Sequence, residues 1–177
     1  KARTALGAYL SKYPHGVFAN KAHYYKAESH YQLNETKEAL AEYDAVLNNN
    51  WSEFSERSAT KAASIAFLGD DHAKAITYYG MLRNSAMNKS TLQDAYKGLM
   101  NSSYILKRYA EAAAYADTVL SLPELPEQAN LEATYIKAMA LQQDNKAEHA
   151  LPIFQKLAAS KKQSVAAQAN YYVAEMH

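Results

Sequence analysis

A helical motif recurs along the chain at nearly constant spacing. In each copy an alanine is followed by a large residue, usually aromatic, after four positions and by an aliphatic residue after seven. Strong copies begin at Ala39, Ala75, Ala112 and Ala150, a weaker copy begins at Ala2, and successive alanines lie 36 to 38 residues apart. Offsets of four and seven residues place the three side chains on one face of an α-helix. A repeat of this length predicts a stack of similar helical units.

A second helical pattern precedes each strong copy. Its mid-helix residue lies 12 or 13 positions before the repeat alanine, at Ala27, Ala62, Met100 and Ala138. Three of these four are small, which lets two antiparallel helices approach closely, and Met100 is matched by the small Ala116 in a size swap that preserves packing volume. Short polar turns separate the two patterns, so each unit is predicted to be a helix, a tight turn and a helix. The predicted organisation is one solenoid over 1–177, with a half repeat at 1–14, units at about 19–50, 52–87, 90–123 and 126–160, and a half repeat at 163–177.

Composition and capping signals also favour helices. Gly (5) and Pro (4) are scarce, and Ser90 followed by Gln93 predicts a capping box at one helix start. We expect more than about 70% helix by circular dichroism. The ten predicted helices span about 1–12, 19–33, 36–48, 52–68, 71–85, 90–106, 109–121, 126–143, 146–159 and 163–176.

Together these features resemble the tetratricopeptide repeat. The resemblance rests on the length of the helix pair, the small and aromatic positions and the turns, and it covers almost the whole chain. It implies an all-α, right-handed α-solenoid of antiparallel helix pairs, whose first helices line a concave groove. The large aromatic expected early in the first helix is replaced by His23, Ser58 and Thr134, and the turn glycine survives only as Gly69. These departures indicate a divergent member.

Carrying the family's groove positions onto this chain predicts a surface that binds a protein or peptide. The candidate residues are Tyr24, Glu28, Tyr31, Phe67, Lys97, Asn101, Tyr104, Tyr135 and Met139. Such a lining suits a polypeptide, because tyrosine combines a large contact area with one hydroxyl. The alternative is that the tyrosines fill the packing between helices. A clamp for a peptide's terminal carboxylate is not expected, since Glu28 stands at a clamp position and would repel the carboxylate. Lys97 and Asn101 do resemble part of such a clamp.

Composition and motifs disfavour other classes of function. The 19 basic and 18 acidic residues leave a net charge of +1, without the basic surplus of most nucleic-acid binders. There are no cysteines, and no stretch approaches the roughly 20 apolar residues that span a bilayer. His23 and His30 share a helix face, but they coincide with packing positions and have no acidic residue or cysteine at ligand spacing. We therefore expect no enzyme activity, no metal and no cofactor.

One short segment carries a narrower resemblance. Residues 10–19, LSKYPHGVFA, close a repeat with Tyr-Pro and lead into a helix rich in Ala and Tyr. This arrangement resembles the bacterial outer-membrane assembly lipoproteins and the periplasmic coordinator of the Tol–Pal system. It implies an envelope assembly role and a periplasmic or outer-membrane-associated location. Two alternatives stay open, a cytoplasmic regulatory or sensor region of a larger signalling protein and a helical-repeat RNA binder.

Both ends of the sequence lie within helix-pair patterns. A second-helix pattern opens the chain with Ala2, Leu6 and Tyr9, and a first-helix pattern with Tyr172 and Val173 closes it. An unstacked repeat leaves its apolar face in water, and neither terminal segment is polar enough for a cap. We therefore expect either flanking repeats or self-association through the C-terminal helix.

Overall fold

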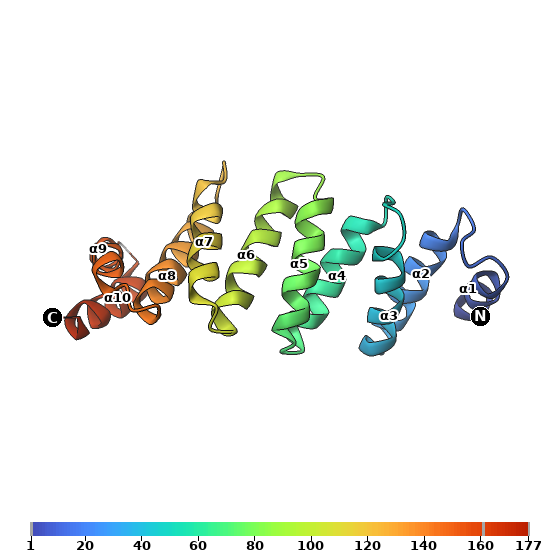
Figure 1. Cartoon of the computed structure of the whole chain (residues 1–177), viewed down its shortest axis with the longest axis horizontal. Helices are drawn as coiled ribbons and strands as arrows, with labels where there is room; N and C mark the ends of the chain where they lie inside the picture. The colour runs from blue at the N-terminus through green and yellow to red at the C-terminus, as the bar shows by residue number, and fades with distance from the viewer. Residues whose placement is uncertain (1, 161, 177) are drawn as a thin grey trace. The chain divides into compact units, whose positions relative to one another are not determined.

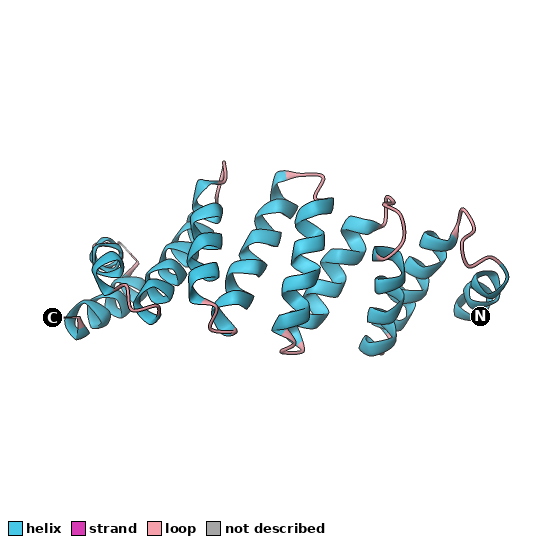
Figure 2. Cartoon of the chain, in the orientation of Figure 1, coloured by secondary structure: helices cyan, strands magenta, loops and turns pink. Residues whose placement is uncertain are grey.

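The computed structural model describes residues 2–160 and 162–176, and the regular elements in these ranges are all α-helices (Figure 2). Helix accounts for 79% of the structure, which confirms the all-α prediction and the α-solenoid class. In chain order the helices are α1 (Ala2–Lys12), α2 (Ala19–Gln32), α3 (Thr36–Leu47), α4 (Ser55–Leu68), α5 (His72–Ser85), α6 (Lys89–Ile105), α7 (Tyr109–Ser121), α8 (Glu127–Gln143), α9 (Ala147–Ala158) and α10 (Gln163–Glu175).

The helices form two compact units, residues 1–92 and residues 93–177. Unit 1 holds α1 to α5 with the first turn of α6, and unit 2 holds the rest of α6 with α7 to α10. Within each unit, helices that follow one another in the sequence lie side by side, such as α2 with α3 and α4 with α5 in unit 1, and α8 with α9 in unit 2 (Figure 1). Each unit is therefore a short series of helix pairs.

Helix limits agree closely with the sequence pattern, except at the start of α4. The other limits lie within one residue of those predicted, whereas α4 begins at Ser55 and not near residue 52. The backbone N–H of Ser52 donates to Ser55 Oγ (3.0 Å), and the N–H of Phe54 donates to Ser52 Oγ (3.3 Å). These side-chain bonds hold the segment in a turn that competes with helix.

A different residue from the one predicted caps α6. Asn88 Oδ1 accepts the backbone N–H of Thr91 at 2.9 Å, which is the N-cap interaction. The Gln93 side chain points elsewhere, because its Nε2 donates to the backbone oxygen of Pro123 at 3.0 Å. The capping box predicted at Ser90 and Gln93 is therefore wrong.

Four turns within the helix pairs share one geometry. After α2, the N–H of Glu35 donates to the oxygen of His30 and the N–H of Asn34 donates to the oxygen of Tyr31, both at 3.0 Å. This double bond pattern is the Schellman motif, which satisfies carbonyls at the helix end and needs a left-handed residue after the C-cap. The left-handed residues, with φ of 59 to 60°, are Asn34, Asp70, Lys107 and Asn145.

Glycine does not fill the left-handed position in any of these four turns. Gly69, the glycine expected to mark its turn, is the C-cap of α4 with φ of −88°, and the next residue, Asp70, has φ of 59°. Asn and Asp tolerate the left-handed region because their short side chains bond locally. Lys107, which follows α6, has no such compensation.

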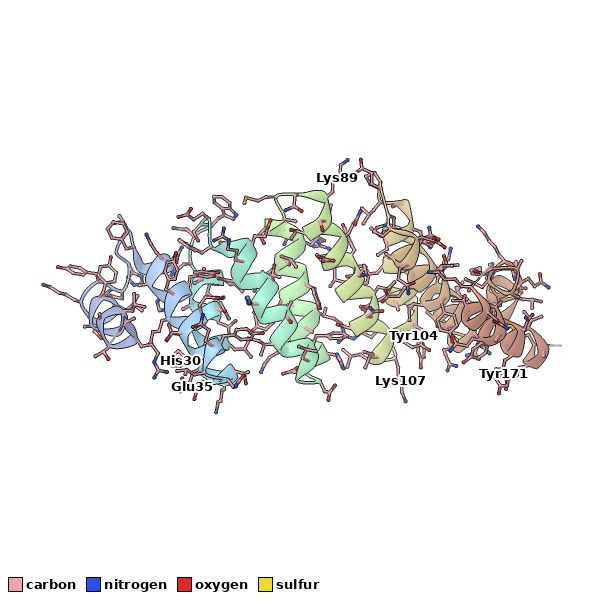
Figure 3. All side chains as sticks on the ribbon, turned by 180° about the vertical axis from the view of Figure 1, so that it is seen from behind. His30, Glu35, Lys89, Tyr104, Lys107 and Tyr171 are labelled. Carbon is pink, nitrogen blue, oxygen red and sulfur yellow. The ribbon has the colours of Figure 1, made fainter. Side chains whose placement is uncertain are left out.

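Replacing Lys107 with glycine is expected to stabilise unit 2 by about 0.5–1 kcal/mol, because glycine carries no penalty at positive φ. Lys107 is exposed, so little packing is lost (Figure 3). Urea denaturation followed by circular dichroism measures the change. Asn145→Gly serves as the matched control with a smaller gain, and a loss of stability in Lys107→Gly would contradict the strain argument.

The repeat trios form the cores of both units. In unit 1 the trio that begins at Ala39 is fully buried in one cluster with Ala27 of α2. In unit 2 the trio that begins at Ala150 is buried in one cluster with Ala138 of α8. The sequence spacing therefore identified the interior face of these two pairs, whereas in the trio that begins at Ala75 the predicted Tyr79 is half-buried and its neighbour Tyr78 is buried.

The size swap in the third pair behaves as expected. Met100 of α6 and Ala116 of α7 are both fully buried and belong to one cluster with Val119 and Ala133. A long side chain thus meets a small one where the other pairs place a small residue opposite an aromatic. Such an exchange of sizes conserves the volume across the contact.

Candidate partner-binding surfaces

The predicted groove residues come from the first helices of the pairs and divide between the two units. Unit 1 contributes four of them from α2 and α4, and unit 2 contributes five from α6 and α8. In unit 1 they are Tyr24, Glu28, Tyr31 and Phe67, and in unit 2 they are Lys97, Asn101, Tyr104, Tyr135 and Met139.

Tyr24 belongs to the core of unit 1 and not to its surface. It is 8% exposed, and its ring lies 5.0 Å from the Phe54 ring and 6.3 Å from the Tyr43 ring. Burial and the nearby Glu28 carboxylate raise the pKa of Tyr24. The structure therefore corrects the prediction that Tyr24 is available to a partner.

Glu28 is half-buried and already engaged. Its carboxylate accepts the hydroxyl hydrogen bond of Tyr43 at 2.5 Å. Burial and the Glu28 charge raise the pKa of Tyr43 far above its ordinary value, so the hydroxyl stays a donor. Glu28 thus links α2 to α3 and adds negative charge near the α2 surface.

Tyr31 and Phe67 are half-buried at the same end of their helices. The Lys61 ammonium lies 4.6 Å from the centre of the Tyr31 ring, a cation–π contact between α4 and α2. Phe67 packs edge-on against His72 (5.0 Å) and Tyr79 (6.4 Å) of α5. Tyr31 also lines a cavity of about 500 Å³ that reaches the turn after α4. Tyr31 is therefore open to this cavity, which Phe67 does not line.

In unit 2, Lys97 and Asn101 converge on one carboxylate. Asn101 Nδ2 donates to Glu132 Oε1 at 2.8 Å, and Lys97 Nζ lies 3.9 Å from Glu132 Oε2. Glu132 belongs to α8, so the contacts join two first helices. A peptide carboxylate that used Lys97 and Asn101 would have to displace Glu132.

Three tyrosines from successive first helices form what we call the tyrosine row: Tyr104 of α6, Tyr135 of α8 and Tyr172 of α10. The rings of Tyr135 and Tyr172 lie 6.4 Å apart. Burial and a hydrogen bond with the Tyr172 hydroxyl raise the pKa of Tyr135 to about 12. Burial and the neighbouring hydroxyls of Tyr109 and Tyr172 also raise the pKa of Tyr104. All three members of the row are half-buried, so part of each side chain remains exposed.

Met139 packs in the same apolar cluster as Tyr135 and Tyr172. It packs against the buried cluster that contains Phe154, and the Phe154 ring stacks on Tyr172 with centroids 5.0 Å apart. Met139 is itself only half-buried. Tyr135 and Tyr172 therefore pack on the cluster that contains Phe154, whereas Tyr104 packs on the cluster of Ala112, Ala113 and Ala140.

Each histidine of α2 has an acidic partner in space, although the local sequence shows none. His23 Nδ1 lies 2.7 Å from Glu42 Oε2, and Lys26 Nζ donates to Glu42 Oε1 at 2.5 Å. His30 Nδ1 lies 2.6 Å from Glu35 Oε2, and the two side chains point toward each other (Figure 3). His23 therefore links α2 to α3, and His30 links α2 to the turn that precedes α3.

The Glu42 contacts predict a pH-dependent stability. Burial raises the pKa of Glu42, but hydrogen bonds from Lys26 and His23 outweigh it and hold the pKa below 4.5. A depressed carboxyl pKa stabilises the fold above the unfolded value and loses that effect as the pH falls through the folded value. We expect Glu42→Gln to cost about 1–2 kcal/mol at neutral pH and progressively less below pH 4.5.

Thermal melts of the unmodified chain and of Glu42→Gln across this acidic range measure that difference. Glu38→Gln is the matched control, because Glu38 is exposed on the same helix. A gap between the two proteins that does not change with pH would contradict the role of Glu42.

Within residues 2–160 and 162–176, no group of three or more His, Asp or Glu side chains is placed to hold a metal ion. No helix in these ranges is both long enough and apolar enough to cross a membrane.

Comparisons with known proteins identify the fold. No protein-family model matches the sequence, and no curated protein matches it. Among solved structures, "YrrB: a TPR protein with an unusual peptide-binding site" aligns with a TM-score of 0.65 and 17% identity, over 97% of this chain and 81% of that chain. The structure of MamA protein aligns with a TM-score of 0.61 and 14% identity, over 87% of this chain and 78% of that chain. The chain has the tetratricopeptide-repeat fold.

The groove prediction did not include Tyr172, but the repeat explains why Tyr172 lies beside Tyr135. Tyr172 lies on α10, which repeats the pattern of α8 after 37 residues: Tyr135, Ile136 and Met139 correspond to Tyr172, Val173 and Met176. That correspondence is visible in the sequence and could have placed Tyr172 beside Tyr135. No sequence pattern identifies Lys61 as a neighbour of Tyr31, because their contact depends on how α4 packs on α2.

Proposed function

We propose that this chain is a protein–protein interaction module that binds a peptide or an extended segment of a partner on its first-helix faces. The tyrosine row of unit 2 is the observation that carries the proposal. Three hydroxyl-bearing rings come from three helices, and Tyr104 and Tyr135 each lie one turn from a member of the Asn101–Glu132 pair. Such a surface combines apolar contact with hydrogen bonding at a small loss of side-chain entropy.

Peptide binding is the first activity to test, because the YrrB structure of the same fold is described as having a peptide-binding site. The row offers hydroxyls and aromatic edges, and Lys97 is balanced by Glu132. We therefore expect peptides with aromatic or aliphatic side chains and few charges, and not peptides that depend on a free terminal carboxylate.

A displayed library of random peptides, selected against the purified chain, supplies ligands whose Kd can be measured by calorimetry. Tyr104→Phe combined with Tyr135→Phe removes two hydroxyls and keeps both rings. We expect this variant to weaken selected peptides at least tenfold, or about 1.4 kcal/mol. Tyr115→Phe on α7 is the matched control. If selected peptides bound the unmodified chain, the double variant and Tyr115→Phe with equal affinity, the row would not be the binding surface.

The partner is proposed to belong to a bacterial envelope assembly. This finer proposal is supported by the Tyr13–Pro14 segment and its likeness to envelope assembly proteins. The rival is a regulatory or sensor region of a cytoplasmic signalling protein. Fractionation of cells that express the full gene, with detection of the native protein, decides between them, since a cytoplasmic location would overturn the envelope role.

A further inference from the structure

Two basic side chains of α4 lie in a row beside α2. Arg57 and Lys61 are four residues apart and therefore lie on one face of α4. The Lys61 ammonium lies 4.6 Å from the centre of the Tyr31 ring of α2. The Arg57 guanidinium interacts with the Tyr24 hydroxyl of the same helix. Arg57 is exposed and Lys61 is half-buried, so part of each side chain remains exposed, and we call this pair the basic row.

Neither member of the basic row has an acidic partner. Arg57 and Lys61 form no ion pair with any residue that the structure describes. α2 and α4 contain one acidic residue each, Glu28 and Glu56, and both carboxylates are engaged elsewhere. Glu28 accepts the hydroxyl hydrogen bond of a tyrosine of α3, and Glu56 accepts hydrogen bonds from the segment 87–91. The basic row therefore carries two positive charges that a ligand carboxylate can offset.

The repeat position of Lys61 holds a lysine in two other first helices, where the charge is neutralised. Lys26, Lys61 and Lys137 each stand one residue before the small mid-helix residue of their helix. Lys26 Nζ lies 2.5 Å from Glu42 Oε1, and Lys137 Nζ lies 2.6 Å from Asp117 Oδ1. Lys61 contacts an aromatic ring instead, which leaves its charge available to a ligand.

The cavity of about 500 Å³ at the turn after α4 begins beside the basic row, because Tyr31 borders both. Its apolar wall comes from Ile65 and Leu68 of α4, and Leu68 is 77% exposed. Its polar wall comes from two amide side chains and one hydroxyl, those of Gln32, Asn34 and Thr36. The described residues that line the cavity are uncharged, so the cavity suits an apolar side chain next to polar backbone groups.

We propose that the basic row and this cavity form one site for a partner segment that carries an acidic residue and a large apolar residue. The inference rests on the proposed function, since it specifies the kind of segment that the first-helix face of unit 1 binds. Ile65 follows Lys61 by four residues, which is about 6 Å along α4. Alternate side chains of an extended segment lie about 6.6 Å apart on one side. The acidic and apolar residues of the partner are therefore expected two positions apart.

Selection from a displayed library of random peptides tests the site, with the unmodified chain and a charge-reversed variant as targets. Arg57→Glu combined with Lys61→Glu reverses both charges of the basic row. We expect the unmodified chain to enrich Asp or Glu two positions from a large apolar residue, and the reversed variant to enrich Lys or Arg in that place. For a selected acidic peptide, the Kd measured by calorimetry should rise at least tenfold in the reversed variant, and it should also rise with salt.

Two further variants control for the change of charge. Arg57→Gln combined with Lys61→Gln removes both charges without adding repulsion, so it should lose the acidic preference and gain no basic one. Lys37→Glu is the matched control, because Lys37 is exposed on α3, away from the basic row. Circular dichroism confirms that each variant is folded.

Leu68→Asn tests the apolar half of the site. Leu68 forms part of the apolar wall, so this variant should lose the preference for a large apolar residue and keep the preference for Asp or Glu. Leu33→Asn is its matched control, because Leu33 is 56% exposed and does not line the cavity.

The outcomes separate this site from the tyrosine row of unit 2. Acidic peptides that lose affinity in the reversed variant and keep it in Lys37→Glu support the site. If the selected peptides depend only on Tyr104 and Tyr135, the inference is overturned and the proposed function stands. An acidic preference that charge reversal does not change also overturns the inference, and a library that yields no binder overturns both.

Discussion

Replacing Tyr43 with alanine is expected to lower the free energy of unfolding of unit 1 by about 3–5 kcal/mol. The Tyr43 ring is fully buried between α2 and α3, and its hydroxyl bonds Glu28. The substitution opens a cavity in the buried core of the pair and removes the donor from a half-buried carboxylate. Because each repeat is stabilised mainly by contacts with its neighbours, we expect the substitution also to destabilise the helices that pack on α3.

Urea denaturation monitored by circular dichroism measures this effect, and two variants calibrate it. Tyr43→Phe keeps the ring and is expected to cost about 1 kcal/mol for the lost hydrogen bond. Tyr13→Ala removes a tyrosine that is 47% exposed, so its effect should be smaller than that of Tyr43→Ala. If Tyr43→Ala and Tyr13→Ala were equally destabilising, the buried position of Tyr43 would be contradicted.

Replacing Ala138 with leucine is expected to destabilise unit 2 by about 1–3 kcal/mol. Ala138 and Ala150 are both fully buried in the cluster that joins α8 to α9, so the structure leaves no room for a larger side chain. Three added carbon atoms must push the helices apart or force a strained rotamer. The tyrosine row should also be disturbed, since Tyr135 lies one turn away on α8.

The change in thermal midpoint measures the overpacking at Ala138. Ala147→Leu is the matched control, because Ala147 is exposed at the start of α9 and leucine adds the same volume there without a clash. A midpoint of Ala138→Leu equal to that of the control would mean that the repeat register assigned to α8 is incorrect.

Helix positions could be predicted from the sequence because they depend on contacts within a few residues. The trio beginning at Ala39 and the turn at Asn34 define a helix pair without reference to the rest of the chain. The cap of α6 was predicted incorrectly because Asn88 and Ser90 are both good N-cap residues. The choice depends on Gln93, whose side chain bonds Pro123, thirty residues away.

The candidate binding surface was only partly predictable for the same reason. Repeat register identified Tyr24 and Tyr31 as equivalent members of a groove, since both lie on α2 at family positions. Their burial differs because Phe54 and Tyr43, from outside α2, enclose Tyr24 and leave Tyr31 at an edge. A helical periodicity specifies which residues share a face, but it does not specify how far a neighbouring helix covers that face.

The sequence by itself determined the helices, the pairing register and the interior trios, because period, small residues and turn chemistry are local properties. Tertiary structure decided which polar groups meet, such as His23 with Glu42, and which rings stay accessible, such as Tyr135 and Tyr172. Those contacts join residues up to 37 positions apart. Their geometry depends on the packing angle and depth of whole helices, and no short-range pattern encodes those quantities.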